Sequence, residues 1–179
     1  MIMIMQTLIS RLFDGAFRQS LPSGTTMFLT GAPVREMFLV ESGEVHLIRH
    51  TASGDRLILH RAGRGAVLAE ASAYSPHYHC DAVAAEAAVL AALPKQVFLD
   101  AMSADAALST AWAASLARAT QGARLRAEIR SLSRVSARLD AWLEAGNALP
   151  DKGRWQDVAA ELGVTREALY RELARRRRL

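Results

Sequence analysis

The chain has 179 residues, of which 51% are hydrophobic and 22% charged, and it carries a formal net charge of +4. This length allows one medium-sized domain or two small ones, and the hydrophobic fraction is enough for a buried core, so we do not expect a disordered protein. A single cysteine, Cys80, excludes an intrachain disulfide framework and is typical of a reducing compartment.

The two ends of the chain have different compositions: the start is apolar and the end is basic. The apolar start, MIMIMQTLIS, is short, has no basic region before it and is soon followed by Arg11 and Asp14. We therefore expect no signal peptide, no membrane span and a cytoplasmic protein. Residues 151–179 hold eight Lys and Arg against five Asp and Glu, so the C-terminal end is where a polyanion such as DNA is expected to bind.

Residues 24–93 alternate short apolar runs with turn residues, a pattern that indicates strands and hairpins. The runs are MFLV, VHLI and RLIL, and the glycines between the runs are Gly24, Gly31, Gly43, Gly54, Gly63 and Gly65. Several short strands at close spacing predict a β-barrel or jelly roll.

Helices are predicted after Pro94, because the sequence becomes rich in Ala, Leu and Arg and has no further proline until Pro150. Apolar residues then recur at three- and four-residue steps, which places them along one stripe of a long helix: Leu108, Trp112, Leu116, Ala119, Ala123, Leu125, Ile129 and Leu132. We expect Ser103 to cap this helix, with Asp105 in its first turn. The stripe between Leu108 and Ile129 can pack on its own barrel and on a second copy in a homodimer.

The resulting α+β architecture has three parts. We predict a sensor β-barrel with flanking short helices over residues 1–102, a dimerisation helix over residues 103–131, and a helix-turn-helix domain over residues 132–179. A further helix is expected over residues 136–146, and a hinge near Arg130–Ser133.

Residues 155–173 have the pattern of a helix-turn-helix. An apolar first helix ends at Gly163, Thr165 is suited to cap the second helix, and Leu169 and Leu173 face inward. The outward residues are Arg166, Glu167, Tyr170 and Arg171. Arginine pairs with guanine and glutamate accepts from cytosine, so this face can read base edges. The alternative is an ordinary solvated helix hairpin.

The arginines at the end of the chain are candidates for contacts with DNA phosphates. The tail from Arg175 and Arg176 to Arg178 can bind the DNA backbone, or it can be a solvated helix end that interacts favourably with the helix dipole.

Together these segments resemble the Crp/Fnr family of bacterial transcription regulators. The stretch from Met37 to Glu70 is similar to the paired strands of the family's barrel, with Gly43, Gly54 and Gly65 at its turn glycines, and Thr165-Arg166-Glu167 followed by Arg171 is similar to its recognition helix. The resemblance implies a cyclic-nucleotide-binding-type barrel, a dimerisation helix and a winged helix-turn-helix. It also implies double-stranded DNA and RNA polymerase as partners, and direct DNA contact by Arg166, Glu167 and Arg171.

The chain departs from the family pattern at two places. In relatives that bind cyclic AMP, a Gly-Glu pair holds the ribose and an Arg-Ser pair holds the phosphate; here these places are Ala69-Glu70 and His79-Cys80. Glu70, His79 and Cys80 are therefore a candidate effector pocket, but cyclic AMP is not expected, because its phosphate loses a bidentate cation. The second departure is the wing, which we expect to be missing after the recognition helix.

The segment His77-Tyr78-His79-Cys80-Asp81 is the densest group of potential ligands. On a strand His77 and His79 share one face, where these two residues, or both together with Asp81, can bind a transition metal. Alternatively they are edge or loop residues, and Cys80 is a small buried hydrophobe or a redox switch. A cupin enzyme also has an H-x-H pair, but its flanking Gly and Glu are absent here, so we expect no enzyme. The alternative function is a barrel protein that acts through ligand or protein binding, including metal or redox sensing, without specific DNA binding.

Overall fold

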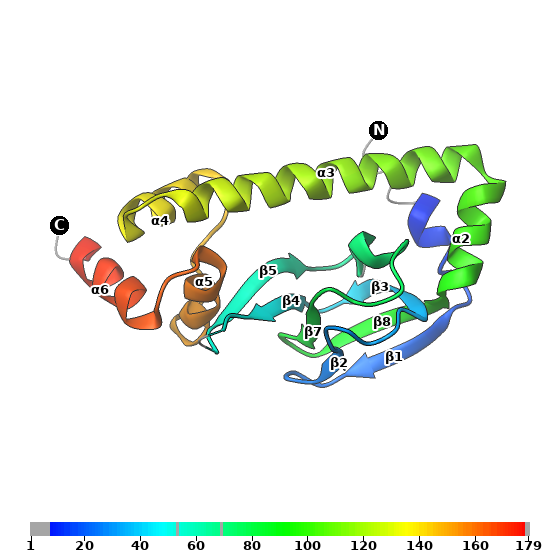
Figure 1. Cartoon of the computed structure of the whole chain (residues 1–179). Helices are drawn as coiled ribbons and strands as arrows, with labels where there is room; N and C mark the ends of the chain where they lie inside the picture. The colour runs from blue at the N-terminus through cyan, green and yellow to red at the C-terminus, as the bar shows by residue number, and fades with distance from the viewer. Residues whose placement is uncertain (1–7, 53, 69, 178–179) are drawn as a thin grey trace. The chain divides into compact units, whose positions relative to one another are not determined.

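The computed structural model of the chain describes residues 8–52, 54–68 and 70–177. The described residues form two compact units, one within residues 1–48 and 61–119 and the other within residues 49–60 and 120–179 (Figure 1). The division into three parts at residues 102 and 131 stays a prediction. No helix among the described residues is long and apolar enough to cross a membrane.

Two antiparallel four-stranded sheets form the jelly roll that the sequence predicts. One sheet has the order β1-β8-β3-β6 and the other β2-β7-β4-β5. The strands are β1 (Phe17–Leu21), β2 (Thr26–Phe28), β3 (Glu36–Ser42), β4 (Val45–His50), β5 (Arg56–Ala62), β6 (Val67–Leu68), β7 (Asp81–Ala84) and β8 (Ala88–Pro94). The runs MFLV, VHLI and RLIL lie in β3, β4 and β5, as predicted.

The core of the first unit joins the β3–β8 sheet to two helices, α2 (Lys95–Ala104) and the first half of α3 (Ala106–Ser131). Met37 and Leu93 from the sheet are buried together with Phe98 of α2 and Trp112 of α3. The Phe98 and Trp112 rings meet edge to face, 5.0 Å apart. Large apolar side chains of this kind contribute most of the hydrophobic stabilisation of a small domain.

A glycine closes the turn between β3 and β4. Gly43 has a φ of +78°, and a Cβ atom at this position would lie 2.3 Å from the carbonyl oxygen of Ala87. Only glycine fits both the left-handed backbone conformation and the close approach of the neighbouring chain.

The start of α3 corrects one prediction. Ser103 is not the N-cap of the long helix, because it lies in the last turn of α2, where its hydroxyl donates to the carbonyl oxygen of Leu99. Asp105 follows and accepts hydrogen bonds from the backbone N–H groups of Ala107 and Leu108. The carboxylate satisfies two N–H groups that the first turn of a helix leaves without partners, so the long helix begins after Asp105 rather than at Ser103.

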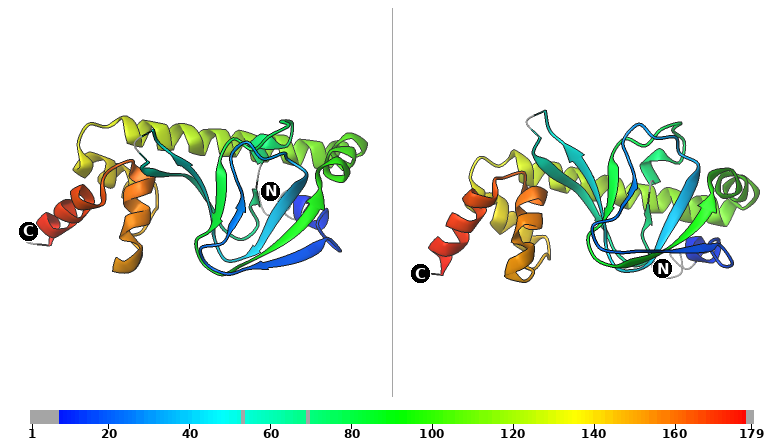
Figure 2. Two further views of the ribbon diagram at one scale, coloured as in Figure 1. Left: turned by 60° about the horizontal axis from the view of Figure 1, so that its bottom comes forward. Right: turned by 90° about the horizontal axis from the view of Figure 1, so that it is seen from below.

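The second unit contains the end of α3 and three short helices. They are α4 (Val135–Glu144), α5 (Trp155–Leu162) and α6 (Arg166–Arg176), as expected from the sequence, and they pack together (Figure 2). Their shared core consists of Ile129, Leu139, Trp142, Trp155, Val158, Ala159, Leu162, Leu169 and Leu173. The break between α3 and α4 falls at residues 132–134, where the sequence places the hinge.

Candidate nucleic-acid interface

The turn between α5 and α6 has the form that a helix-turn-helix requires. Gly163 ends α5 in the left-handed conformation, with φ +64° and ψ +42°, and the N–H of Val164 donates to the carbonyl oxygen of Ala159. The Thr165 hydroxyl oxygen then accepts from the N–H of Ala168 and caps α6. Both features match the sequence prediction, because each is set by the local backbone.

The cap and the buried side chains fix which face of α6 is exposed. Leu169 and Leu173 are buried, whereas the side chains of Arg166, Glu167 and Arg171 are exposed. Glu167 and Arg171 form no hydrogen bond or ion pair with any described residue. Their polar groups are therefore available to bind another molecule, and DNA contact by these three residues stays a prediction.

Tyr170 is only half-buried. Its hydroxyl donates to the carbonyl oxygen of Lys152 at 3.3 Å, and its ring meets the Trp155 ring at a centroid distance of 5.3 Å and an angle of 67°. The Arg166 guanidinium carbon lies 5.3 Å from the centre of the same ring. Tyr170 thus contacts its own chain on two sides.

Two of the three described arginines of the predicted phosphate-binding tail, Arg175 and Arg176, differ in exposure. The exposed Arg175 donates to both carboxylate oxygens of Glu172, at 3.0 and 2.8 Å, and this hydrogen bonding is the main cause that lowers the pKa of Glu172. Arg176 pairs with Asp140 at 2.7 Å, and also with Glu172, so it joins α6 to α4. Arg178 lies outside the described residues.

Two arginines outside the predicted site, Arg130 and Arg138, donate hydrogen bonds to backbone carbonyl groups of the helix-turn-helix and its surroundings. Arg130 donates from Nε to the carbonyl oxygen of Glu161, at 2.8 Å, and from Nη2 to that of Ile58. Arg138 donates from Nη1 to the carbonyl oxygens of Leu162 and Gly163. No sequence motif indicates these contacts, because the partners are backbone carbonyls distant along the chain.

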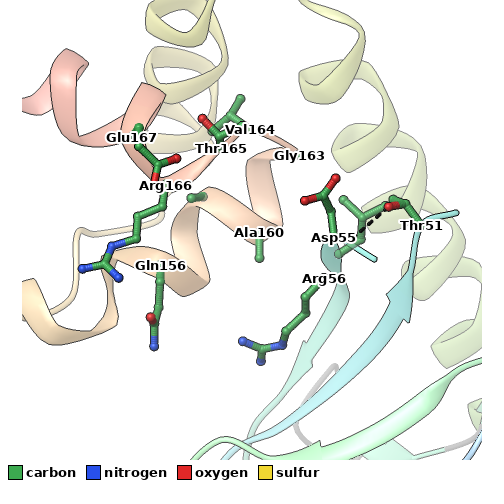
Figure 3. Close-up of a pocket in the computed structure, with 12 residues that line it drawn as sticks. Thr51, Asp55, Arg56, Gln156, Ala160, Gly163, Val164, Thr165, Arg166 and Glu167 are labelled. Atoms are coloured by element: carbon green, nitrogen blue, oxygen red, sulfur yellow. Dashed lines mark hydrogen bonds between the residues drawn. The ribbon is translucent and has the colours of Figure 1, made fainter. Parts of the chain in front are cut away.

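The same unit contains a pocket of about 600 Å³ beside the start of α6. It is lined from one side by residues of the β4–β5 hairpin and from the other by α5, the turn and the first residues of α6, and Figure 3 shows Gln156 between Arg166 and Arg56. Arg56 contacts Asp157 of α5 at 3.0 Å, and Arg154 contacts the second oxygen of Asp157 at 3.5 Å. The hairpin therefore borders the face of α6 that carries Arg166 and Glu167.

His77 and His79 do not lie together on a strand, so the structure agrees with the alternative in which they are edge or loop residues. Strand β7 begins only at Asp81, and His77 forms an isolated bridge with Pro33. The reason is local: Pro76 lacks an N–H, and the Ser75 hydroxyl donates to the carbonyl oxygen of His77, which closes a turn. His77 and His79 are both exposed, but among the described residues no three His, Cys, Asp or Glu side chains gather as metal ligands.

The candidate effector residues lie in different local environments. Glu70 begins a short 3₁₀ helix, η1 (Glu70–Ser72), and the His79 ring nitrogen Nδ1 lies 2.9 Å from the Ser72 hydroxyl. Cys80 is buried with 2% of its surface exposed. None of the three lines the pocket beside α6, and Ala69 lies outside the described residues.

The comparisons with known proteins agree with this architecture. Residues 18–105 match the family model of the cyclic nucleotide-binding domain. A comparison with curated proteins finds no match.

Several solved structures are similar over most of the chain. CLP, a c-di-GMP-responsive global regulator from Xanthomonas campestris, is 21% identical with a TM-score of 0.78, and the match covers 96% of this chain and 91% of CLP. FixK2 from Bradyrhizobium japonicum is 20% identical with a TM-score of 0.74, covering 89% and 83%. The catabolite activator protein from Thermus thermophilus is 26% identical with a TM-score of 0.59, covering 94% and 81%. The barrel match and the shared fold agree with the resemblance noted in the sequence: residues 18–105 are similar to a cyclic nucleotide-binding domain, and the chain has the fold of these solved regulators.

Proposed function

We propose that the chain is a sequence-specific DNA-binding regulator that acts as a homodimer on a palindromic operator in the cytoplasm. The observation that carries this proposal is the exposed face of α6, where Arg166, Glu167 and Arg171 are presented by a capped helix whose opposite face is buried. Arginine and glutamate are suited to the donor and acceptor pattern of base edges in the major groove.

The interface of the proposed homodimer is the middle of α3. Leu108 and Trp112 are buried in the first unit and Ile129 in the second, but Ala123 and Leu125 between them are exposed, with 45% of Leu125 accessible. A second copy that covers this stretch places two recognition helices on one DNA duplex, with half-sites about 34–36 Å apart. RNA polymerase is the further partner that we propose for a regulator of this type.

Backbone contacts accompany base contacts in such complexes. We assign Arg175 to a DNA phosphate, because its side chain is exposed and its pairing with Glu172 at the surface costs little to exchange. Arg176 has less freedom, since Asp140 and Glu172 both hold it, and we assign it a structural role.

The barrel is proposed to respond to an effector other than cyclic AMP. At the place where relatives that bind cyclic AMP have an arginine, His79 interacts with Ser72 at 2.9 Å, and the adjacent Cys80 is buried. A cyclic phosphate at this position lacks the bidentate guanidinium that binds phosphate most strongly. We therefore expect calorimetric titration with cyclic AMP to give no heat of binding.

The central experiment selects duplexes from a randomised DNA library with the full chain and then titrates the selected duplex and a scrambled duplex across salt concentrations. We expect affinity to fall steeply with salt on both duplexes, with a preference for the selected one that persists. Glu167→Ala and Arg171→Ala should each lose about 1–3 kcal/mol of that preference at the base pair they contact.

A matched control is Arg64→Ala, which removes an exposed arginine from the turn between β5 and β6. It should keep the preference of the unmodified chain. Equal binding of the unmodified chain to both duplexes would exclude a sequence-specific regulator and favour a barrel protein that acts through ligand or protein contacts.

A further inference from the structure

We propose that Tyr170 is a positioning residue for Arg166: its ring holds the guanidinium in one orientation for base reading, and Tyr170 itself does not read a base. This inference rests on the proposed function, because it concerns how α6 recognises DNA. It assigns to Tyr170 a different role from its neighbours on the exposed face.

The Tyr170 ring is the platform on which the Arg166 guanidinium lies, and two contacts hold this ring in place. The Tyr170 hydroxyl donates to the carbonyl oxygen of Lys152, and the ring packs edge to face on Trp155. Trp155 is in turn fixed, since 7% of its surface is exposed and its indole N–H donates to the carbonyl oxygen of Pro150 at 3.0 Å. A tyrosine held in this way has little freedom to turn toward a groove.

Helix geometry then places Arg166 above the platform. Residues four apart on a helix are neighbours on its surface, and the Arg166 guanidinium carbon lies 5.3 Å from the centre of the Tyr170 ring. This distance is within the range of a cation–π interaction, in which the cation lies over the face of the ring.

Stacking suits an arginine that must also read a base. The guanidinium is planar, so its face can lie on an aromatic ring while its N–H groups stay available for a bidentate contact with guanine. An exposed arginine loses several rotatable bonds of freedom when it binds, and a side chain already held in its bound orientation loses less. Tyr170 therefore increases discrimination through Arg166, without a contact of its own.

Trp155, the second ring of the pair with Tyr170, also contacts an arginine of the chain. The guanidinium carbon of Arg177, the residue directly after α6, lies 4.9 Å from the centre of the Trp155 ring, so the pair of rings Trp155 and Tyr170 contacts arginines near both ends of α6. Each ring therefore already has an arginine of its own chain over one face.

Two substitutions separate the ring from the hydroxyl. Tyr170→Phe keeps the platform and loses only the hydrogen bond to Lys152, whereas Tyr170→Leu keeps apolar packing on Trp155 and loses the ring. On the duplex selected by the unmodified chain, we expect Tyr170→Phe to keep its discrimination between base pairs. Tyr170→Leu should lose roughly three- to tenfold at the same base pair that Arg166→Ala affects, with unchanged affinity for scrambled DNA.

The double variant Arg166→Ala with Tyr170→Leu decides between positioning and direct reading. If Tyr170 acts through Arg166, the double variant discriminates no less than Arg166→Ala alone. Losses that add, or that fall on a different base pair, overturn the proposal, as does a Tyr170→Leu protein that discriminates like the unmodified chain.

A measurement without DNA keeps this inference separate from the proposed function. In the free protein, the ring current of Tyr170 should shift the Nε–Hε NMR signal of Arg166 upfield in the unmodified chain and in Tyr170→Phe, and the shift should be absent in Tyr170→Leu. An unmodified chain that selects no DNA sequence removes the proposed function, while an Arg166 signal that is the same in all three proteins removes the positioning role of Tyr170.

Discussion

The Nη1 atom of Arg138 lies 2.9 Å from the carbonyl oxygen of Gly163, in the turn between α5 and α6. The same atom donates to the carbonyl oxygen of Leu162, and Nε donates to that of Leu132 at 2.6 Å. One side chain therefore satisfies carbonyl groups just after α3 and at the end of α5, which the helices leave without internal partners. A positive charge at helix C-termini adds to the stabilisation.

Replacing Arg138 by Met should lower the free energy of unfolding by about 2 kcal/mol, because the aliphatic stem stays but carbonyl groups lose a charged donor. Urea denaturation measures the change. The matched control is Arg134→Met, on the same segment but exposed, which should stay within about 0.5 kcal/mol of the unmodified protein. Equal stability of the two variants would contradict the role assigned to Arg138.

Gly43→Ala should destabilise the barrel more than Gly65→Ala. Both glycines have positive φ, +78° and +83°, so each alanine pays the backbone strain of about 1–2 kcal/mol. A Cβ at Gly65 meets nothing within 4 Å, whereas at Gly43 it collides with backbone atoms of Ala87 and Ala88. Thermal melting of the two variants tests this difference. Identical melting temperatures would show that the backbone at Ala87 moves aside without lowering the stability of the barrel.

The hairpin residue His60 should make stability depend on pH. Burial, and secondarily Arg126, lowers the pKa of His60 from 6.5 to about 4. Above pH 6.5 the imidazole is neutral in both states and contributes no pH dependence. Between pH 6.5 and 4 the unfolded chain binds a proton that the folded chain does not, so the free energy of unfolding falls as the pH falls, by up to about 3 kcal/mol.

The comparison that isolates this effect is His60→Gln, since every other ionisable group is the same in both proteins. Urea denaturation at pH 7 and at pH 4.5 should give a smaller loss of stability for His60→Gln than for the unmodified chain. Parallel losses would show that His60 is protonated as readily in the folded protein as in the unfolded one.

A double-mutant cycle on Arg56 and Asp157 should give a coupling of about 0.5–1 kcal/mol, because their 3.0 Å contact is only partly shielded from solvent. The variants are Arg56→Ala and Asp157→Asn, with stability as the measured quantity. Arg154 provides the internal comparison: it lies 3.5 Å from the same carboxylate and should couple more weakly. No coupling for Arg56 would mean that the hairpin does not hold α5 through this pair.

Features set by neighbouring residues were predictable from the sequence. The runs in β3, β4 and β5, the left-handed Gly163 and the Thr165 cap all follow from local periodicity and backbone preference. The same local reasoning chose the wrong cap for α3, because Ser103 and Asp105 both suit that role and only the end of α2 decides between them.

Features that join distant segments were not predictable. Arg130 and Arg138 are two of several arginines with similar spacing, and nothing in the sequence distinguishes those that find backbone carbonyls. Tyr170 was predicted to face DNA, and its contacts with Lys152 and Trp155 depend on how the loop before α5 folds back.

The β4–β5 hairpin has a practical consequence for dissecting the protein. Residues 49–60 cluster with residues 120–179, and they supply Arg56 to Asp157 and the Ile58 carbonyl oxygen to Arg130. A fragment cut out as residues 120–179 leaves a carboxylate and a guanidinium without these partners. Exchange of the helix-turn-helix unit between proteins of this fold should therefore carry the hairpin tip along with the helices, even though the two pieces are about sixty residues apart in the sequence.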